Sequence, residues 1–98
     1  MKINLEALPE TTTDALRELV TSKVERLDKF FSRIVAADVY LKDVGGAEEP
    51  CSAEIRINVP NDTLFCSERG ASYEEAIDKA SRAMERQLKK FKDKLAAH

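Results

Sequence analysis

The sequence predicts a two-layer α+β sandwich, in which a four-stranded sheet carries both of its helices on one face. Four short stretches alternate apolar with polar residues, which is the pattern of strands that bury a single side. Two longer stretches repeat their apolar residues with the period of an amphipathic helix. These stretches follow one another in the order β-α-β-β-β-α over 98 residues, and we interpret residues 1–98 as one domain.

The first half of the chain is expected to form a strand, a helix and a second strand. Lys2 to Ala7 alternates, and Pro9 is expected to end this strand. Threonines at positions 11–13 offer N-cap side chains for a helix from about Thr13 to Ser32. Val35 to Asp43 alternates again, and a glycine-containing loop follows it. The apolar stripe of the helix consists of Leu16, Leu19, Val20, Val24, Leu27, Phe30, Phe31 and Ile34.

The second half is expected to form a hairpin and the longest helix. Cys51 to Val59 is the clearest strand, and Thr63 to Arg69 is its hairpin partner across a tight turn. Gly70 is expected to break that second strand. The helix from Ser72 to Leu95 begins with a capping box, which Ser72 forms with Glu75. Its apolar stripe consists of Tyr73, Ile77, Ala80, Met84, Leu88, Phe91 and Leu95.

Charge is unevenly distributed along the chain. The segment from Lys79 to Lys94 holds seven cations and two acids, a charge of +5, whereas the rest of the chain sums to −7 and the whole to −2. The first helix also sorts its charges by sign, with Lys23, Arg26, Lys29 and Arg33 along one flank. A face of one sign suits a polyanion, of which nucleic acid is the commonest. The alternative is a solvated helix face without a partner, although such faces usually mix their signs.

The sequence offers little support for an enzyme. The single histidine is His98, the final residue, and no glycine-rich phosphate-binding loop is present. Cys51 and Cys66 match no metal spacing, and the hairpin register is expected to keep the two thiols apart and unbridged. We therefore predict no catalytic residues, no metal and no cofactor. No signal peptide or apolar run of membrane-spanning length is apparent, so we expect a cytoplasmic protein that does not bind membranes.

The face of the sheet away from the helices is expected to be wet. Tyr40 and Phe65 are expected on this face, where they could stack a nucleic-acid base or simply pack against neighbouring side chains. The polar residues expected on the same face are Asn4, Glu6, Asp38, Lys42, Glu54, Arg56 and Asn58.

Three segments of the sequence together resemble one protein family. They are KVERLDKFF at positions 23–31, AEIRINVPNDTLFCS at positions 53–67 and ERQLKKFKDKL at positions 85–95. With the order of elements, they resemble the ribosome hibernation factors, the short hibernation-promoting factor and the ribosome-associated inhibitor, earlier described as sigma-factor modulation proteins. The resemblance implies a β-α-β-β-β-α fold that is similar to a double-stranded-RNA-binding domain with one extra strand.

The resemblance also implies a function. Members of the family bind the small ribosomal subunit in the channel of messenger and transfer RNA, contact ribosomal RNA through basic helix faces, and silence idle ribosomes. The chain looks like a short form, which we expect to be monomeric away from the ribosome, although a net charge of −2 is low for an RNA-binding protein. The RNA-binding residues implied by position are Lys23, Arg26, Lys29, Arg82, Arg86, Lys90 and Lys94, with Lys79 and Lys89 as weaker matches.

Two other functions remain open on the sequence. A generic double-stranded-RNA-binding module would bind any RNA duplex equally well. A protein-interaction subunit would use the exposed sheet or its edges, and its binding would respond little to salt.

Overall fold

The protein is described by a computed structural model that covers residues 1–8 and 10–96. The predicted strand end at Pro9 and the terminal His98 lie outside the described residues. The elements, in chain order, are β1 (Lys2–Glu6), α1 (Asp14–Glu25), a 3₁₀ helix η1 (Arg26–Lys29), β2 (Ala36–Asp43), β3 (Cys51–Val59), β4 (Asp62–Gly70) and α2 (Tyr73–Ala96).

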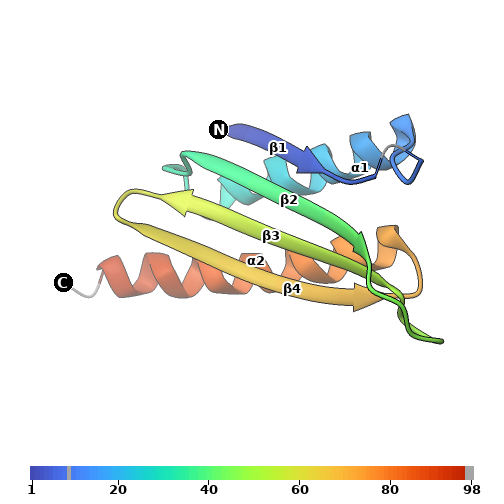
Figure 1. Cartoon of the computed structure of the whole chain (residues 1–98). Coiled ribbons are helices and arrows are strands. Elements are labelled where there is room, and N and C mark those ends of the chain that lie inside the picture. The colour runs from blue at the N-terminus through green and yellow to red at the C-terminus, as the bar shows by residue number, and fades with distance from the viewer. Residues whose placement is uncertain (9, 97–98) are drawn as a thin grey trace.

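The four strands form one mixed sheet, and both helices cover the same face of it (Figure 1). The strand order is β1-β2-β3-β4, where β1 is parallel to β2 and the other neighbours are antiparallel. Helix α1 connects the two parallel strands, and α2 returns along the sheet after β4 (Figure 1). The predicted two-layer α+β fold is confirmed.

The core lies between the sheet and the two helices. Alternate residues of β2 and β3 point toward the helices and are buried, apart from the half-buried Cys51 at the start of β3 and the exposed end of β2, as the period of two predicts. At one end of the core, the rings of Phe31 and Phe91 meet edge to face with their centroids 5.3 Å apart. The largest fully buried side chains are Leu27, Ile55, Ile57, Ile77, Met84, Leu88, Val20, Val24 and Val39.

The first helix differs from the prediction at its end. The N-cap is Thr13, whose hydroxyl accepts the N–H of Leu16 at 3.1 Å. The α-helix stops at Glu25, and the chain then tightens into η1 instead of continuing to Ser32. The Leu27 carbonyl accepts the N–H of Phe30 at 3.0 Å, an i to i+3 bond of the kind that closes many helix C-termini.

The hairpin register places the two cysteines apart. Cys66 pairs with Ile55 and Cys51 pairs with Gly70, at separate positions along β3, and both thiols are free. The Cys66 thiol donates a hydrogen bond to the Ala80 carbonyl at 3.2 Å, and burial raises its pKa to about 11. This thiol is therefore held in its neutral form against α2.

The strand ends at Gly70, close to where the sequence predicted its break, but Gly70 itself belongs to the strand. Gly70 is the last residue of β4 and is buried beneath the start of α2. A Cβ at this position would lie 2.8 Å from the backbone nitrogen of Ala76. The glycine is needed because α2 begins close against the strand, not because the strand ends before it.

The start of α2 is capped as predicted, but by half of the capping box. The Ser72 hydroxyl accepts the N–H of Glu75 at 3.1 Å. The Glu75 carboxylate does not return to the cap, because it lies 3.1 Å from the Lys79 ammonium one turn further on.

Candidate nucleic-acid interface

A polar groove with a volume of about 430 Å³ runs between α2 on one side and α1 with η1, which we call the first helical segment, on the other. Five cations and two carboxylates line it, which gives a net formal charge of +3. The groove exists because α1 and α2 pack side by side on one face of the sheet (Figure 1). Its lining residues are Lys23, Arg26, Asp78, Ser81, Arg82, Glu85, Arg86 and Lys89, and we call it the basic groove.

Asp78 links the two helices across the basic groove. Its carboxylate accepts a hydrogen bond from the Lys23 ammonium at 2.8 Å and lies 3.3 Å from the Arg82 guanidinium. The hydrogen bond from Lys23 lowers the pKa of Asp78, and the charges of Lys23, Arg82 and Arg26 lower it further. Asp78 is therefore ionised at neutral pH, and it neutralises part of the charge that the groove offers to an anion.

Three cations of the basic groove have no carboxylate partner among the described residues. They are Arg26 on η1 together with Arg86 and Lys89 on α2. All three side chains belong to exposed residues. Because no described carboxylate neutralises them, these three are the cations of the groove that are most available to an anion.

The basic surface continues beyond the groove toward the C-terminal end of α2. A neighbouring depression is lined by Lys29, Lys89 and Lys92, beside Phe30 and Asp93. The Lys89 ammonium lies 5.0 Å from the centroid of the Phe30 ring, which holds this cation where the two depressions meet. Lys92 was not among the predicted site residues. The sequence feature that could have identified it is its spacing of about one helical turn from Lys89.

The structure brings six of the nine predicted residues together at this surface, namely Lys23, Arg26, Lys29, Arg82, Arg86 and Lys89. Lys90 and Lys94 are exposed on α2 but line neither depression.

Lys79 stands apart from the groove. Its ammonium lies 3.0 Å from Glu49 and 3.1 Å from Glu75, and it donates to the Arg69 carbonyl at 3.1 Å. Hydrogen bonds to Glu49 and then Glu75 raise the pKa of Lys79. Lys79 therefore fastens the β2–β3 loop to α2, and its charge is already matched by two carboxylates.

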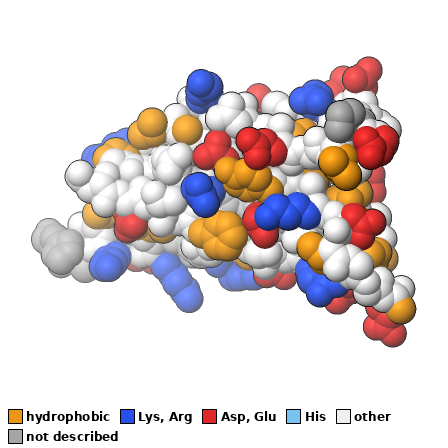
Figure 2. All heavy atoms as spheres, in the orientation of Figure 1, with side chains coloured by type: hydrophobic (Ala, Val, Ile, Leu, Met, Phe, Trp, Pro, Cys, Tyr) orange, Lys and Arg blue, Asp and Glu red, His pale blue; other side chains and the backbone are white. Residues whose placement is uncertain are grey.

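The open face of the sheet has a different character. Phe65 is 48% exposed there, and Tyr40 lies beneath Arg56 and Lys42, each cation 5.9 Å from its ring centroid. Figure 2 shows apolar side chains in the middle of this face with both signs of charge around them. Asp38 lies opposite Arg56 on the neighbouring strand, and Glu54 lies beside Lys42. The two signs of charge are therefore mixed on this face, which gives it no single-sign field for a polyanion.

Two further kinds of site are absent from the part of the chain that the structure describes. None of its helices is long and apolar enough to cross a membrane. Within the same residues, no cluster of three or more histidine, cysteine or acidic side chains could hold a metal ion.

Comparison with known proteins assigns the family. The family model described as Sigma 54 modulation protein / S30EA ribosomal protein matches residues 9–96. The ribosome hibernation promoting factor of Escherichia coli K12 is 35% identical over 98 residues, the full length of both chains. The ribosome hibernation promotion factor of Deinococcus radiodurans is 42% identical over 82 residues, and that match spans 82% of this chain and 43% of the relative's length.

Two solved structures share the fold of this chain. The N-terminal domain of Protein Y from Thermus thermophilus superposes with a TM-score of 0.73 at 32% identity, covering 92% of this chain and 94% of that one. A ribosomal subunit interface protein from Coxiella burnetii, 19% identical, shares the fold with a TM-score of 0.82 over 95% of this chain and 99% of that one. On the match to the family model and the full-length similarity to the Escherichia coli factor, the chain belongs to the family of Sigma 54 modulation proteins and S30EA ribosomal proteins.

Proposed function

We propose that this protein is a ribosome hibernation factor that binds the small ribosomal subunit in its messenger and transfer RNA channel and so inhibits translation. The observation that carries the proposal is the basic groove, where two helices present cations to one ligand. Relatives that bear the name ribosome hibernation promoting factor support the partner.

The chemistry of the groove suits RNA phosphates. Arg26 and Arg86 carry planar guanidinium groups that can pair a phosphate through two hydrogen bonds, and Lys89 adds a point charge. Such contacts position a protein on RNA without reading its sequence, so specificity comes from the shape of the RNA surface. The acidic remainder of the chain repels phosphate, which leaves the groove side as the one that faces RNA.

Sedimentation with separated ribosomal subunits tests this function. We expect the protein to sediment with the small subunit and not with the large one, and a free RNA duplex of about 20 base pairs to compete poorly. It should also inhibit a cell-free translation system, and excess messenger RNA with initiation components should relieve the inhibition because they compete for one channel. Equal affinity for any RNA duplex would indicate a generic double-stranded-RNA-binding module instead. Full translation at saturating protein would contradict the proposal.

Asp78→Asn is expected to strengthen binding to the small subunit about 3- to 10-fold at low salt. The amide keeps the shape of Asp78 but removes the negative charge that now neutralises Lys23 and Arg82. The slope of log affinity against log salt should steepen by about 1. Unchanged affinity with an unchanged slope would show that Lys23 and Arg82 do not contact phosphate.

The same substitution should also change how the stability of the fold depends on pH. Because the pKa of folded Asp78 is lowered below its usual value of 3.8, the charged form stabilises the fold above that pH. This contribution is lost as the pH falls through the lowered pKa. The thermal unfolding midpoints of the unmodified protein and of Asp78→Asn, followed by circular dichroism, should therefore differ less below about pH 4 than at neutral pH.

A further inference from the structure

A second groove lies at the end of the sheet where β1 stops before its neighbour does. Pairing of β1 with β2 ends at Glu6 and Tyr40, whereas β2 continues along β3 as far as Asp43. Residues 41–43 of β2 therefore have a strand neighbour on only one side among the described residues. The groove beside them has a volume of about 430 Å³, and we call it the edge groove.

The backbone of β2 is oriented to accept another strand in the edge groove. Val44 donates its N–H to the Pro50 carbonyl at 2.8 Å, on the β3 side. Backbone groups alternate in direction along a strand, so the N–H and C=O of Asp43 are directed to the open side. An open stretch of strand edge is a template for an added strand.

The walls of the edge groove are mostly apolar. Leu8 is 60% exposed and Val44 is 51% exposed, and they are two of the most exposed large apolar side chains in the described residues. The apolar lining consists of Ala7, Leu8, Tyr40, Leu41, Val44 and Tyr73. These walls disfavour a phosphate ligand and favour side chains with apolar atoms.

The charge around the edge groove selects a cation. Glu6 and Asp43 line it, while Lys42, the one cation among its described lining residues, lies 3.2 Å from Glu54 on the open face of the sheet. Burial, and then the charges of Asp43 and Glu74, raise the pKa of Cys51, which pairs with Asp43 across β2 and β3. The edge groove thus differs from the basic groove in both polarity and sign, and no described residue lines both.

We propose that the edge groove binds an extended, basic segment of a protein partner, which adds to the sheet as a short strand beside residues 41–43. Backbone hydrogen bonds to the open edge of β2 hold the segment. Its lysine or arginine side chains meet Glu6 and Asp43, and its apolar side chains pack between Leu8 and Val44. This surface is independent of the ribosomal RNA contact proposed for the basic groove.

The test uses a fluorescent eight-residue peptide in which lysine alternates with valine, with binding followed by anisotropy at about 50 mM salt. Two control peptides are used: one replaces lysine with glutamate, and the other carries N-methyl groups on alternate amides and cannot pair with a strand. We expect the lysine peptide to bind and both controls to lose at least about 10-fold in affinity. Equal binding of the N-methylated peptide would overturn strand addition.

Variants of the protein locate the site. Glu6→Gln with Asp43→Asn should weaken binding of the lysine peptide about 5- to 10-fold, whereas the charge-matched control, Glu18→Gln with Asp28→Asn on the first helical segment, should leave it unchanged. Asparagine at position 43 can still accept the Gly45 N–H, so the loop keeps its bond.

A second pair of variants tests the apolar walls. Leu8→Ser with Val44→Ser should weaken binding about 10-fold, and Val35→Ser with Leu95→Ser, which changes exposed apolar residues elsewhere, should not. Equal losses in test and control variants would overturn the proposal. Concentration-dependent dimerisation that the Leu8 and Val44 changes abolish would also overturn it, since the occupant would then be a second copy of this chain.

Discussion

A variant with Arg26→Ala, Arg86→Ala and Lys89→Ala is expected to bind the small ribosomal subunit about 100-fold more weakly at physiological salt. These are the cations of the basic groove that no described carboxylate neutralises, so each can give its charge to a phosphate. Three lost charge-assisted contacts at about 1 kcal/mol each correspond to roughly that factor. Equilibrium sedimentation or filter binding across a salt series measures it.

The salt dependence should change with the affinity. Each phosphate contact releases counterions, so removing three contacts should reduce the slope of log affinity against log salt by about 2–3. The three residues are exposed and alanine favours helices, so the unfolding midpoint should barely change. A lower affinity with an unchanged salt slope would indicate that the substitutions altered the shape of the protein surface and did not remove phosphate contacts.

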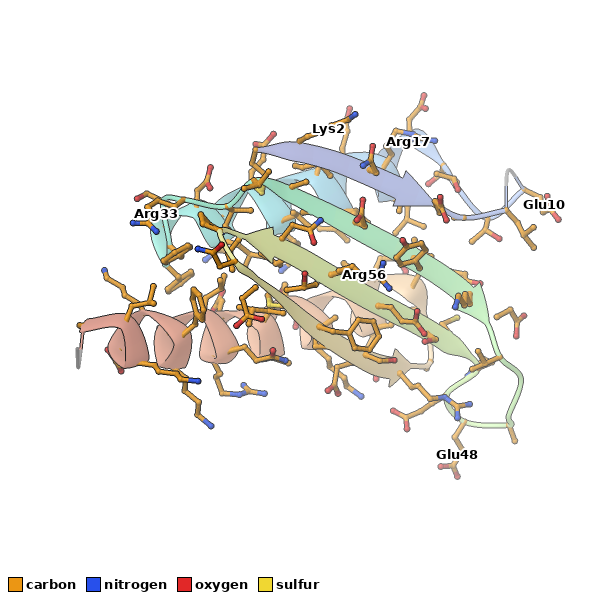
Figure 3. All side chains as sticks on the ribbon, turned by 60° about the vertical axis from the view of Figure 1, so that its left-hand side comes forward. Lys2, Glu10, Arg17, Arg33, Glu48 and Arg56 are labelled. Carbon is orange, nitrogen blue, oxygen red and sulfur yellow. The ribbon has the colours of Figure 1, made fainter. Side chains whose placement is uncertain are left out.

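The matched control removes three cations that lie elsewhere. Lys2 and Arg17 stand at the β1 edge of the molecule, and Arg56 stands over the open face of the sheet (Figure 3). Alanine at all three changes the net charge by the same amount, yet binding and salt slope should stay close to those of the unmodified protein. If this control loses as much affinity as the groove variant, the protein binds through its overall charge and the basic groove has no special role.

The sequence predicted the basic groove in part because helical period determines which side chains share an arc. Arg82, Arg86 and Lys89 fall on one arc whatever the helix packs against, and all three line the groove. Which flank of that arc faces the first helix depends on where the helices lie over the sheet. That placement brings Lys92, and not Lys90, to the depression beside Lys89. The spacing of Lys92 from Lys89 can be read in the sequence, but the side of α2 on which the first helix lies cannot.

Lys79 shows a second limit of sequence reasoning. The helical period places Lys79 near the exposed arc of α2. In the structure, however, the β2–β3 loop brings the Glu49 carboxylate, 30 residues earlier in the sequence, into contact with the Lys79 ammonium. The Arg69 guanidinium holds the same loop through the carbonyls of Gly45 and Glu49. Irregular loops have no period, so a cation that a loop neutralises cannot be told from a free one in the sequence.

The fold was more predictable than the site because strands and helices of this protein follow their periods closely. The four alternating stretches became four strands, with one difference at Gly70, whose role comes from a close approach between β4 and α2. The first helix ended early because η1 tightens the chain while Leu27 stays fully buried. Both differences arise from contacts between elements, which sequence pattern does not encode locally.

Gly70→Ala is expected to lower the free energy of unfolding by about 2–3 kcal/mol. The new Cβ would lie 2.8 Å from the Ala76 nitrogen and 3.0 Å from the Glu75 Cβ. Neither is the end of a flexible side chain, so α2 must shift away from β4. Thermal unfolding should show a midpoint lower by roughly 10–20 °C.

Gly45→Ala separates this steric effect from backbone strain. Gly45 has a φ of 77°, and a Cβ there meets nothing within 4 Å, so alanine should cost only about 1–2 kcal/mol through its unfavourable left-handed conformation. Gly70 is absent from the positive-φ glycines, so alanine there carries no such strain and, without the close contact, would stabilise the protein slightly by restricting the unfolded chain. If Gly70→Ala proves as stable as the unmodified protein or more so, α2 does not pack closely on the end of β4, and close packing is not what requires a glycine at this position.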